Sequence, residues 1–177
     1  MKRRTFLHHF PKAIGLLSLS GTLAAQIRPL SLDAQQWNCL AAVQEHLLPS
    51  EPHAPGSLDI RATAYLDRTL ADPGFDPDIR TFLLQGILWL EDIAQKRAGL
   101  PFHQMVPADR ETLLHNIARS PTGERWLSLL LDYTLEALLA DPLYGGNPGG
   151  IGWRWLEHDP GRPRPTPDKI YGRLEKV

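Results

Sequence analysis

Histidine, cysteine and carboxylate side chains are the groups in this chain that could do chemistry, and they are thinly spread. Metal sites on helices typically use a His-x-x-x-His or Glu-x-x-His spacing, and neither occurs. The best candidate set is His46, His53 and Asp59, which a proline-rich loop can bring together. Glu111 and His115 fit a surface pair one helical turn apart. A metal site at the first three residues therefore stays one alternative.

The sequence gives even less support for a catalytic nucleophile or a nucleotide-binding loop than for a metal site. Cys39 is the single cysteine, so an internal disulfide and a cysteine-ligated cluster are excluded, and no Gly-x-Ser-x-Gly elbow occurs. The glycine cluster at 145–150 lacks the Lys-Ser/Thr of a phosphate loop and follows a helical pattern instead of a strand. Glu136 lies among leucines and alanine, where we expect it to face solvent. The sequence thus predicts no cofactor site in this chain.

The first 25 residues indicate export. Paired Arg3 and Arg4 precede Phe6 and Leu7, and a short apolar run with small residues follows to Ala25. This pattern is typical of a twin-arginine signal, and the run is too short for a membrane span of about 20 residues. The twin-arginine translocase carries folded proteins, so the expected destination is the periplasm. An ordinary secretory signal is the alternative.

The net charge expected after signal cleavage argues against a nucleic-acid partner. Cleavage near Ala24 or Ala25 removes Lys2, Arg3, Arg4 and Lys12, leaving 15 of 19 basic residues against 20 acidic ones, a net charge of −5. Nucleic-acid binding needs clustered cations, so no nucleic-acid partner is expected. No second apolar run approaches a membrane span, and we expect membrane contact only through another protein.

Apolar residues at helical spacing predict an all-α fold, a bundle of about five helices at 26–141. The first is expected at about 33–48, and the second is capped by Ser57 or Asp59 and carries apolar residues up to Leu70. The third runs from Asp76-Pro77 to Ala98 with Gly99 after it, the fourth begins near Pro107, and the fifth begins at Ser120-Pro121. The third is apolar nearly all round, which predicts a central position or a cover from another chain.

Residues 142–177 form a Gly/Pro-rich arm and tail. Residues 142–167 hold six prolines and six glycines, so we expect an ordered, extended arm without regular helix or strand in 143–153. Its aromatic residues and flexible backbone predict a partner-docking surface. The alternative is that the arm caps the bundle's own core. The residues predicted to dock are Tyr144, Gly145, Gly146, Asn147, Gly152, Trp153 and Trp155.

Four stretches carry a family resemblance: the Arg3–Leu7 signal, residues 47–67, residues 102–114 and, above all, residues 136–153. The most specific motif is Asp-Pro-x-Tyr-Gly-Gly-Asn at 141–147 with Gly152-Trp153. The chain resembles subunit 3 of membrane-bound gluconate 2-dehydrogenase and related small subunits of flavin-dependent sugar dehydrogenases. It departs from that pattern after Trp153.

The resemblance implies a non-catalytic subunit. Its partner would be a large flavoprotein of the glucose–methanol–choline type that holds FAD and oxidises a sugar or polyol, often with a cytochrome c subunit. The small subunit would supply the export signal and help the large one mature. Cys39 is expected off the apolar stripe of its helix, where either an inter-subunit disulfide or a free thiol is open. A stand-alone periplasmic enzyme and a transient export chaperone remain the alternative functions.

Overall fold

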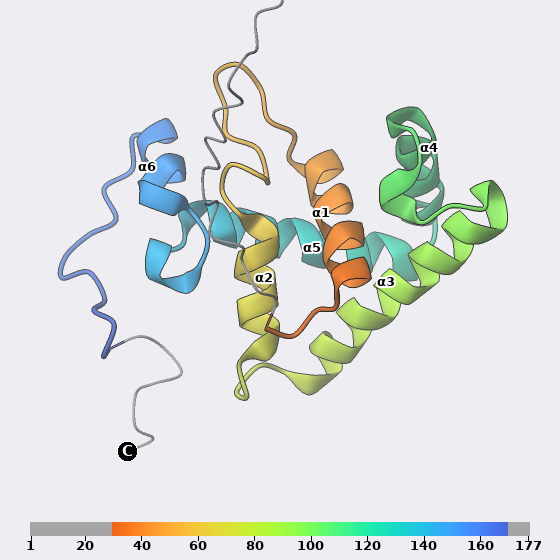
Figure 1. The fold of residues 1–177 in the computed structure, drawn as a ribbon. Helices are drawn as coiled ribbons and strands as arrows, with labels where there is room; N and C mark the ends of the chain where they lie inside the picture. The colour runs from red at the N-terminus through yellow and green to blue at the C-terminus, as the bar shows by residue number, and fades with distance from the viewer. Residues whose placement is uncertain (1–29, 170–177) are drawn as a thin grey trace, which may run out of the picture.

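A computed structural model describes residues 30–169, and this part of the chain is helical (Figure 1). Its bundle helices are α1 (Ala34–Leu47), α2 (Ala62–Ala71), α3 (Pro77–Ala98), α4 (Pro107–Ala118) and α5 (Pro121–Leu139). Shorter helical segments are η1 (Phe102–Gln104), η2 (Pro142–Tyr144), η3 (Pro148–Gly150) and α6 (Ile151–Trp155). The all-α prediction is confirmed.

Local capping explains why α1, α3 and α5 begin where the sequence predicts. The Asp33 carboxylate accepts from the Gln36 N–H at 2.8 Å and the Gln36 side chain accepts from the Asp33 N–H at 2.9 Å, which forms a capping box on α1. Asp76 caps α3 ahead of a proline, and Gly99 ends that helix in the left-handed conformation with φ 67°. Ser120 caps α5 in the same way by accepting from the Gly123 N–H.

The start of α2 differs from the prediction. Neither Ser57 nor Asp59 caps it, because the helix begins at Ala62 after Arg61, which has a φ of 56°. The Asp59 carboxylate instead accepts from Ser50 Oγ at 2.6 Å and from the Gly56 N–H at 2.9 Å. Both bonds lower the pKa of the Asp59 carboxyl, the Ser50 bond most. Asp59 therefore closes the loop before the helix.

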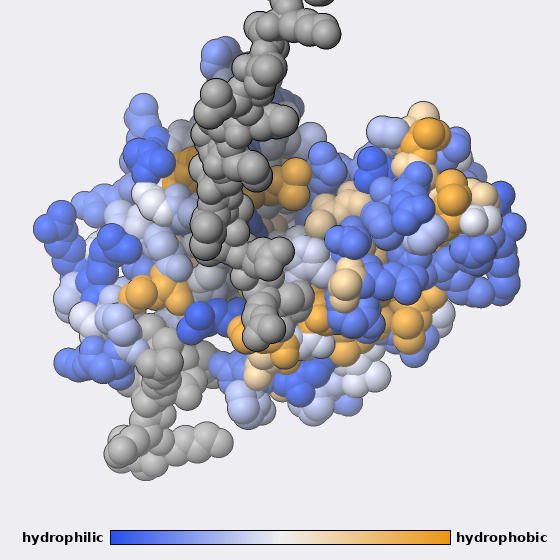
Figure 2. Space-filling model, viewed as in Figure 1, coloured by the Kyte–Doolittle hydropathy of each residue, from blue (hydrophilic) through white to orange (hydrophobic). Residues whose placement is uncertain are grey.

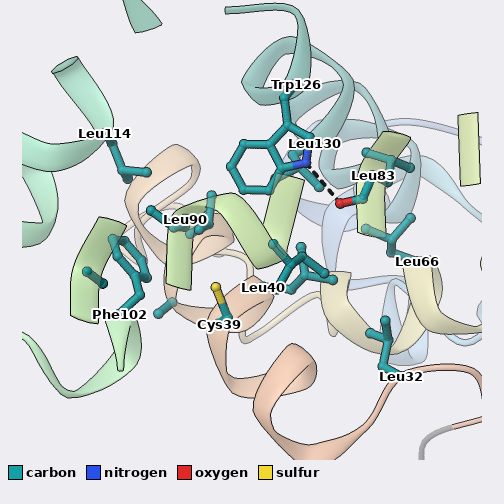
Figure 3. Close-up of a cluster of buried hydrophobic side chains, with 14 of the residues drawn as sticks. Leu32, Cys39, Leu40, Leu66, Leu83, Leu90, Phe102, Leu114, Trp126 and Leu130 are labelled. Atoms are coloured by element: carbon teal, nitrogen blue, oxygen red, sulfur yellow. Dashed lines mark hydrogen bonds between the residues drawn. The ribbon is translucent and has the colours of Figure 1, made fainter. Parts of the chain in front are cut away.

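The core lies between α1, α2, α3 and α5, with η1 against α1 and α3 (Figure 3). Trp126 of α5 donates its indole N–H to the Leu83 carbonyl of α3 at 3.0 Å. A buried polar network ties three helices together, since Gln44 of α1 donates to Thr134 of α5 and accepts from Thr63 of α2. Every hydrogen-bonding side chain in this network has a partner, which offsets the cost of burying it.

Helix α3 is only partly covered by the rest of residues 30–169. It buries Leu83, Ile87 and Leu90 against the core, while the Leu88 and Trp89 side chains stay 54% and 44% exposed. Its apolar surface therefore extends beyond what the bundle itself covers. None of the helices in residues 30–169 is both long and apolar enough to cross a bilayer.

The C-terminal arm is more compact than the expected extended segment. Residues 142–155 form η2, η3 and α6, and α6 packs on α5. The prediction that 143–153 contains no regular helix is wrong at its end, where α6 begins at Ile151. Positive φ values at Gly145, Gly149 and Gly150 reverse the chain between short turns, and only glycine adopts such values readily.

Candidate partner-docking site

Asn147 fastens the C-terminal arm to the bundle. It is fully buried with a φ of 49°, a conformation that asparagine tolerates better than most residues. Its backbone N–H donates to the Ile60 carbonyl at 2.8 Å, and its side-chain Nδ2 donates to the Ala140 carbonyl at 3.0 Å. Its Oδ1 accepts from the Gly152 N–H at 2.7 Å. The Asn147 side chain thus joins the end of α5 to the start of α6, and its backbone N–H joins both to the loop before α2.

The arm's glycines permit its close approach to α5. A Cβ at Gly152 would lie 2.1 Å from the Leu138 carbonyl oxygen, and one at Gly146 would lie 2.8 Å from the Ala137 carbonyl oxygen. Trp153 follows with its ring packed inward and its indole N–H donating to the Leu139 carbonyl at 2.8 Å. In the sequence, the pair Gly152-Trp153 indicates this close packing of the arm on α5.

Most of the predicted docking residues of the arm are therefore used inside this chain. Gly146, Asn147, Gly152 and Trp153 are buried, and they cap the bundle's own core as the alternative interpretation held. Trp155 is 42% exposed. Tyr144 and Gly145 are partly exposed. Docking of a partner on the arm stays a prediction, and it concerns these last three residues.

Cys39 lies in the core instead of on a docking surface. Its exposure is 0%, and Figure 3 shows its sulfur among core side chains from neighbouring helices. Burial, and then the nearby Glu91 carboxylate, raise the pKa of the Cys39 thiol. Helix α1 is covered by α2 and α5 and also by α3 and η1, so residues off its main apolar stripe are buried too. An inter-subunit disulfide does not fit this position.

The residues of the hypothetical metal site are engaged separately. His46 Nδ1 lies 3.0 Å from Glu111 Oε2, whereas Asp59 bonds to its own loop and His53 is exposed. The other Glu111 oxygen lies 2.8 Å from His115 Nε2, which confirms that surface pair. Between residues 30 and 169 no three His, Cys, Asp or Glu side chains are placed to hold a metal ion.

A groove of about 540 Å³ opens between α3, α4 and α5, and the sequence analysis did not predict it. The sequence feature that could have indicated the groove is the spacing of Gly86, Trp89, Ile93 and Arg97, which places them on one face of α3. The remaining lining residues are Leu90, Leu113, Asn116, Ile117, Ser120, Thr122, Gly123 and Trp126. We refer to these twelve residues as the α3–α5 groove.

A second groove of about 700 Å³ lies on α2 and α5 and carries aromatic and acidic residues. Tyr65 donates its hydroxyl to Glu136 Oε2 at 3.2 Å, and Glu136 is exposed as expected. Burial, followed by the Glu136 charge, raises the pKa of Tyr65 to about 12. The same causes raise the pKa of Tyr133.

The predicted export residues Arg3, Arg4, Phe6 and Leu7 lie outside the described residues. Comparison with known proteins bears on the rest of the chain. Searches of curated proteins and of solved structures found no match. A family model described as gluconate 2-dehydrogenase subunit 3 matches residues 34–161, which include the helices α1 to α6 of the described part of the chain and the Asn147 contacts. The chain therefore belongs to the gluconate 2-dehydrogenase subunit 3 family.

Proposed function

We propose that this chain is the non-catalytic small subunit of a periplasmic dehydrogenase complex. It brings a large FAD-containing subunit of the glucose–methanol–choline type through the twin-arginine translocase, helps it mature and stabilises it. A cytochrome c subunit is a further expected member of the complex. FAD is held by the large subunit.

The observation that carries this proposal is the family match over residues 34–161. Two features of the chain support it. The Arg3-Arg4 signal suits cargo that is exported already folded, and the α3–α5 groove with exposed Trp89 offers a surface that a second protein can cover. A stand-alone metal enzyme has less support, because His46 and Asp59 are each engaged by other partners.

The decisive experiment replaces the paired arginines by Arg3→Lys and Arg4→Lys in cells that also express the dehydrogenase subunit. We expect both proteins to remain in the cytoplasm, because the complex has only this signal to use. Dehydrogenase activity and FAD are then measured in periplasmic and cytoplasmic fractions. Lys12→Gln is the matched control, since it changes a charge in the same segment without touching the arginine pair.

Two outcomes would contradict the proposal. Periplasmic dehydrogenase activity in the arginine double variant would show that the large subunit travels independently. Secretion of this chain without any co-purifying flavoprotein would favour a transient chaperone or an unrelated function.

A further inference from the structure

The α3–α5 groove has an apolar floor without unsatisfied polar groups. Leu90, Leu113 and Trp126 are buried beneath it, and the Trp126 N–H is already bonded to the Leu83 carbonyl. Gly86 makes this floor possible, because a Cβ there would lie 2.0 Å from Trp126 Nε1. The exposed apolar surface of the groove belongs to Trp89 and to the partly exposed Ile93 and Ile117. A partner that covers these side chains removes that surface from water and leaves the indole hydrogen bond of Trp126 intact.

Trp89, which lines the groove, is a partly exposed aromatic residue that a partner can bury. Trp89 is 44% exposed and meets Phe82 edge-on, with ring centroids 6.4 Å apart at an interplanar angle of 74°. Figure 2 shows hydrophobic residues among hydrophilic ones over the part of the molecule formed by α3 and α4. A partly exposed tryptophan held by a second ring is typical of residues that dominate binding at interfaces.

The charge at this groove is positive although the exported chain is acidic overall. Arg97 is the one charged residue among the twelve that line it. Arg125 lies over the Phe82 ring at 5.3 Å from the centroid. Neither guanidinium has an ion pair within the described residues, whereas neighbouring Asp92 is paired with Lys96 at 2.6 Å. Glu124, beside Arg125, lies in the first turn of α5, where the helix dipole favours a carboxylate.

We propose that the α3–α5 groove binds an acidic amphipathic helix of the dehydrogenase subunit, an inference that rests on the function proposed above. The partner's apolar side chains would fill the groove beside Trp89, and its carboxylates would pair with Arg97 and Arg125. Arg97 follows Gly86 by 11 residues, which is a distance of about 16 Å along the axis of α3. A partner helix of about three turns has the same length. The chain's own export segment suits the groove poorly, since its charges are Lys2, Arg3, Arg4 and Lys12.

The test measures the affinity of the purified subunit for its co-expressed dehydrogenase partner. Trp89→Ala removes the anchor and Arg97→Glu reverses the groove charge without altering the core. Leu58→Ala, at a 58% exposed apolar side chain outside the groove, and Arg162→Glu, a charge reversal in the exposed tail, are the controls, and Trp155→Ala tests the arm as the competing docking surface. We expect each groove variant to weaken binding at least about tenfold and each control to change it less than about twofold. The complex should also weaken with added salt.

Circular dichroism melts establish that each variant is folded before affinity is compared. If the wild-type subunit binds the dehydrogenase but both groove variants bind as well as it does, the groove inference is overturned and the proposed function stands. Weakening by Trp155→Ala alone would assign docking to the arm and also overturn it. Loss of self-association in place of dehydrogenase binding would show that a second copy occupies the groove. Failure of the wild-type subunit to bind any dehydrogenase would overturn the proposed function itself.

Discussion

Asp67 holds the first described residues of the chain against α2. Its buried carboxylate accepts from the Leu30 N–H at 2.6 Å and from the N–H groups of Ser31 and Leu32 at 2.8 Å each. Three backbone donors on one carboxylate make a charge-assisted clamp. The segment that follows the export signal is thereby fastened to the folded domain.

Replacing Asp67 by Asn should destabilise the domain by about 2–3 kcal/mol, because a single amide oxygen cannot accept all three donors and the NH₂ group opposes them. Urea unfolding measures the loss, and hydrogen exchange of the Leu30–Leu32 amides should accelerate. Asp132→Asn, at an exposed position of α5, is the control and should cost less than about 0.5 kcal/mol. Equal losses in the two variants would show that the clamp does not contribute.

Ionisation of the buried Tyr65 hydroxyl should make the folded domain less stable at high pH. Its pKa is raised to about 12 by burial and by Glu136, whereas an unfolded tyrosine ionises near pH 10. The stabilisation by neutral Tyr65 is therefore complete below about pH 10 and is lost as the pH rises towards 12. Unfolding measured at pH 8 and pH 11 should show a smaller difference for Tyr65→Phe than for the wild type. The same difference in both proteins would exclude Tyr65 as the cause.

At the scale of the elements, the helices are specified locally but their contacts depend on small residues. Gly86 admits Trp126 between α3 and α5, and Gly152 admits α6 against the end of α5. In both places the neighbouring atoms are too close for any side chain. Close approach, and not backbone flexibility, is thus the reason for glycine at these two positions.

Gly152→Ala should cost about 1–3 kcal/mol, because the new methyl group would lie 2.1 Å from a backbone carbonyl that cannot move freely. Thermal and urea unfolding measure this loss. Gly74→Ala is the matched control, since its Cβ would meet only a side-chain oxygen of Asp72 at 3.3 Å. A Gly152→Ala domain as stable as the control would mean that α6 shifts without cost.

At the scale of the whole molecule, the arm completes the domain. A small apolar cluster of Ile60, Ala62, Ala137 and Leu138 lies where the arm meets α2 and α5. The tail beyond it returns through Arg164, which pairs with Asp141 at 2.9 Å and lies over the Trp153 ring. The arm is therefore part of the fold, and partner docking on its exposed residues stays a prediction.

Two C-terminally truncated variants distinguish the contribution of the arm to stability from that of the tail beyond it. A variant that ends at Ala140 should lose at least about 3 kcal/mol, as for truncation of a core tryptophan, because Trp153 and the Asn147 bonds are removed. A variant that ends at Leu156 keeps those contacts and loses the exposed Arg164 pair, so its loss of stability should be much smaller. Melting temperatures compare them. Equal stability of the two variants would exclude the arm from the core.

The sequence by itself determined the helical class, the starts of α1, α3, α4 and α5, and the resemblance that the family match confirms. These features depend on capping residues, prolines and periodicity within a few positions of one another, so they can be recognised without a fold. The start of α2 could not be recognised in this way, because the Asp59 carboxylate accepts hydrogen bonds from Ser50 and Gly56 within the loop instead of capping the helix.

Only the tertiary structure decided that Cys39 is buried, that Asn147 and Trp153 belong to the core, and that a groove opens between α3 and α5. Each depends on contacts between residues far apart in the chain, such as Asn147 with Ile60 and Trp126 with Leu83. Periodicity assigns a face to a helix but does not say how many neighbours cover it. Which side chains remain for a partner is therefore decided by packing, after the bundle has buried what it can.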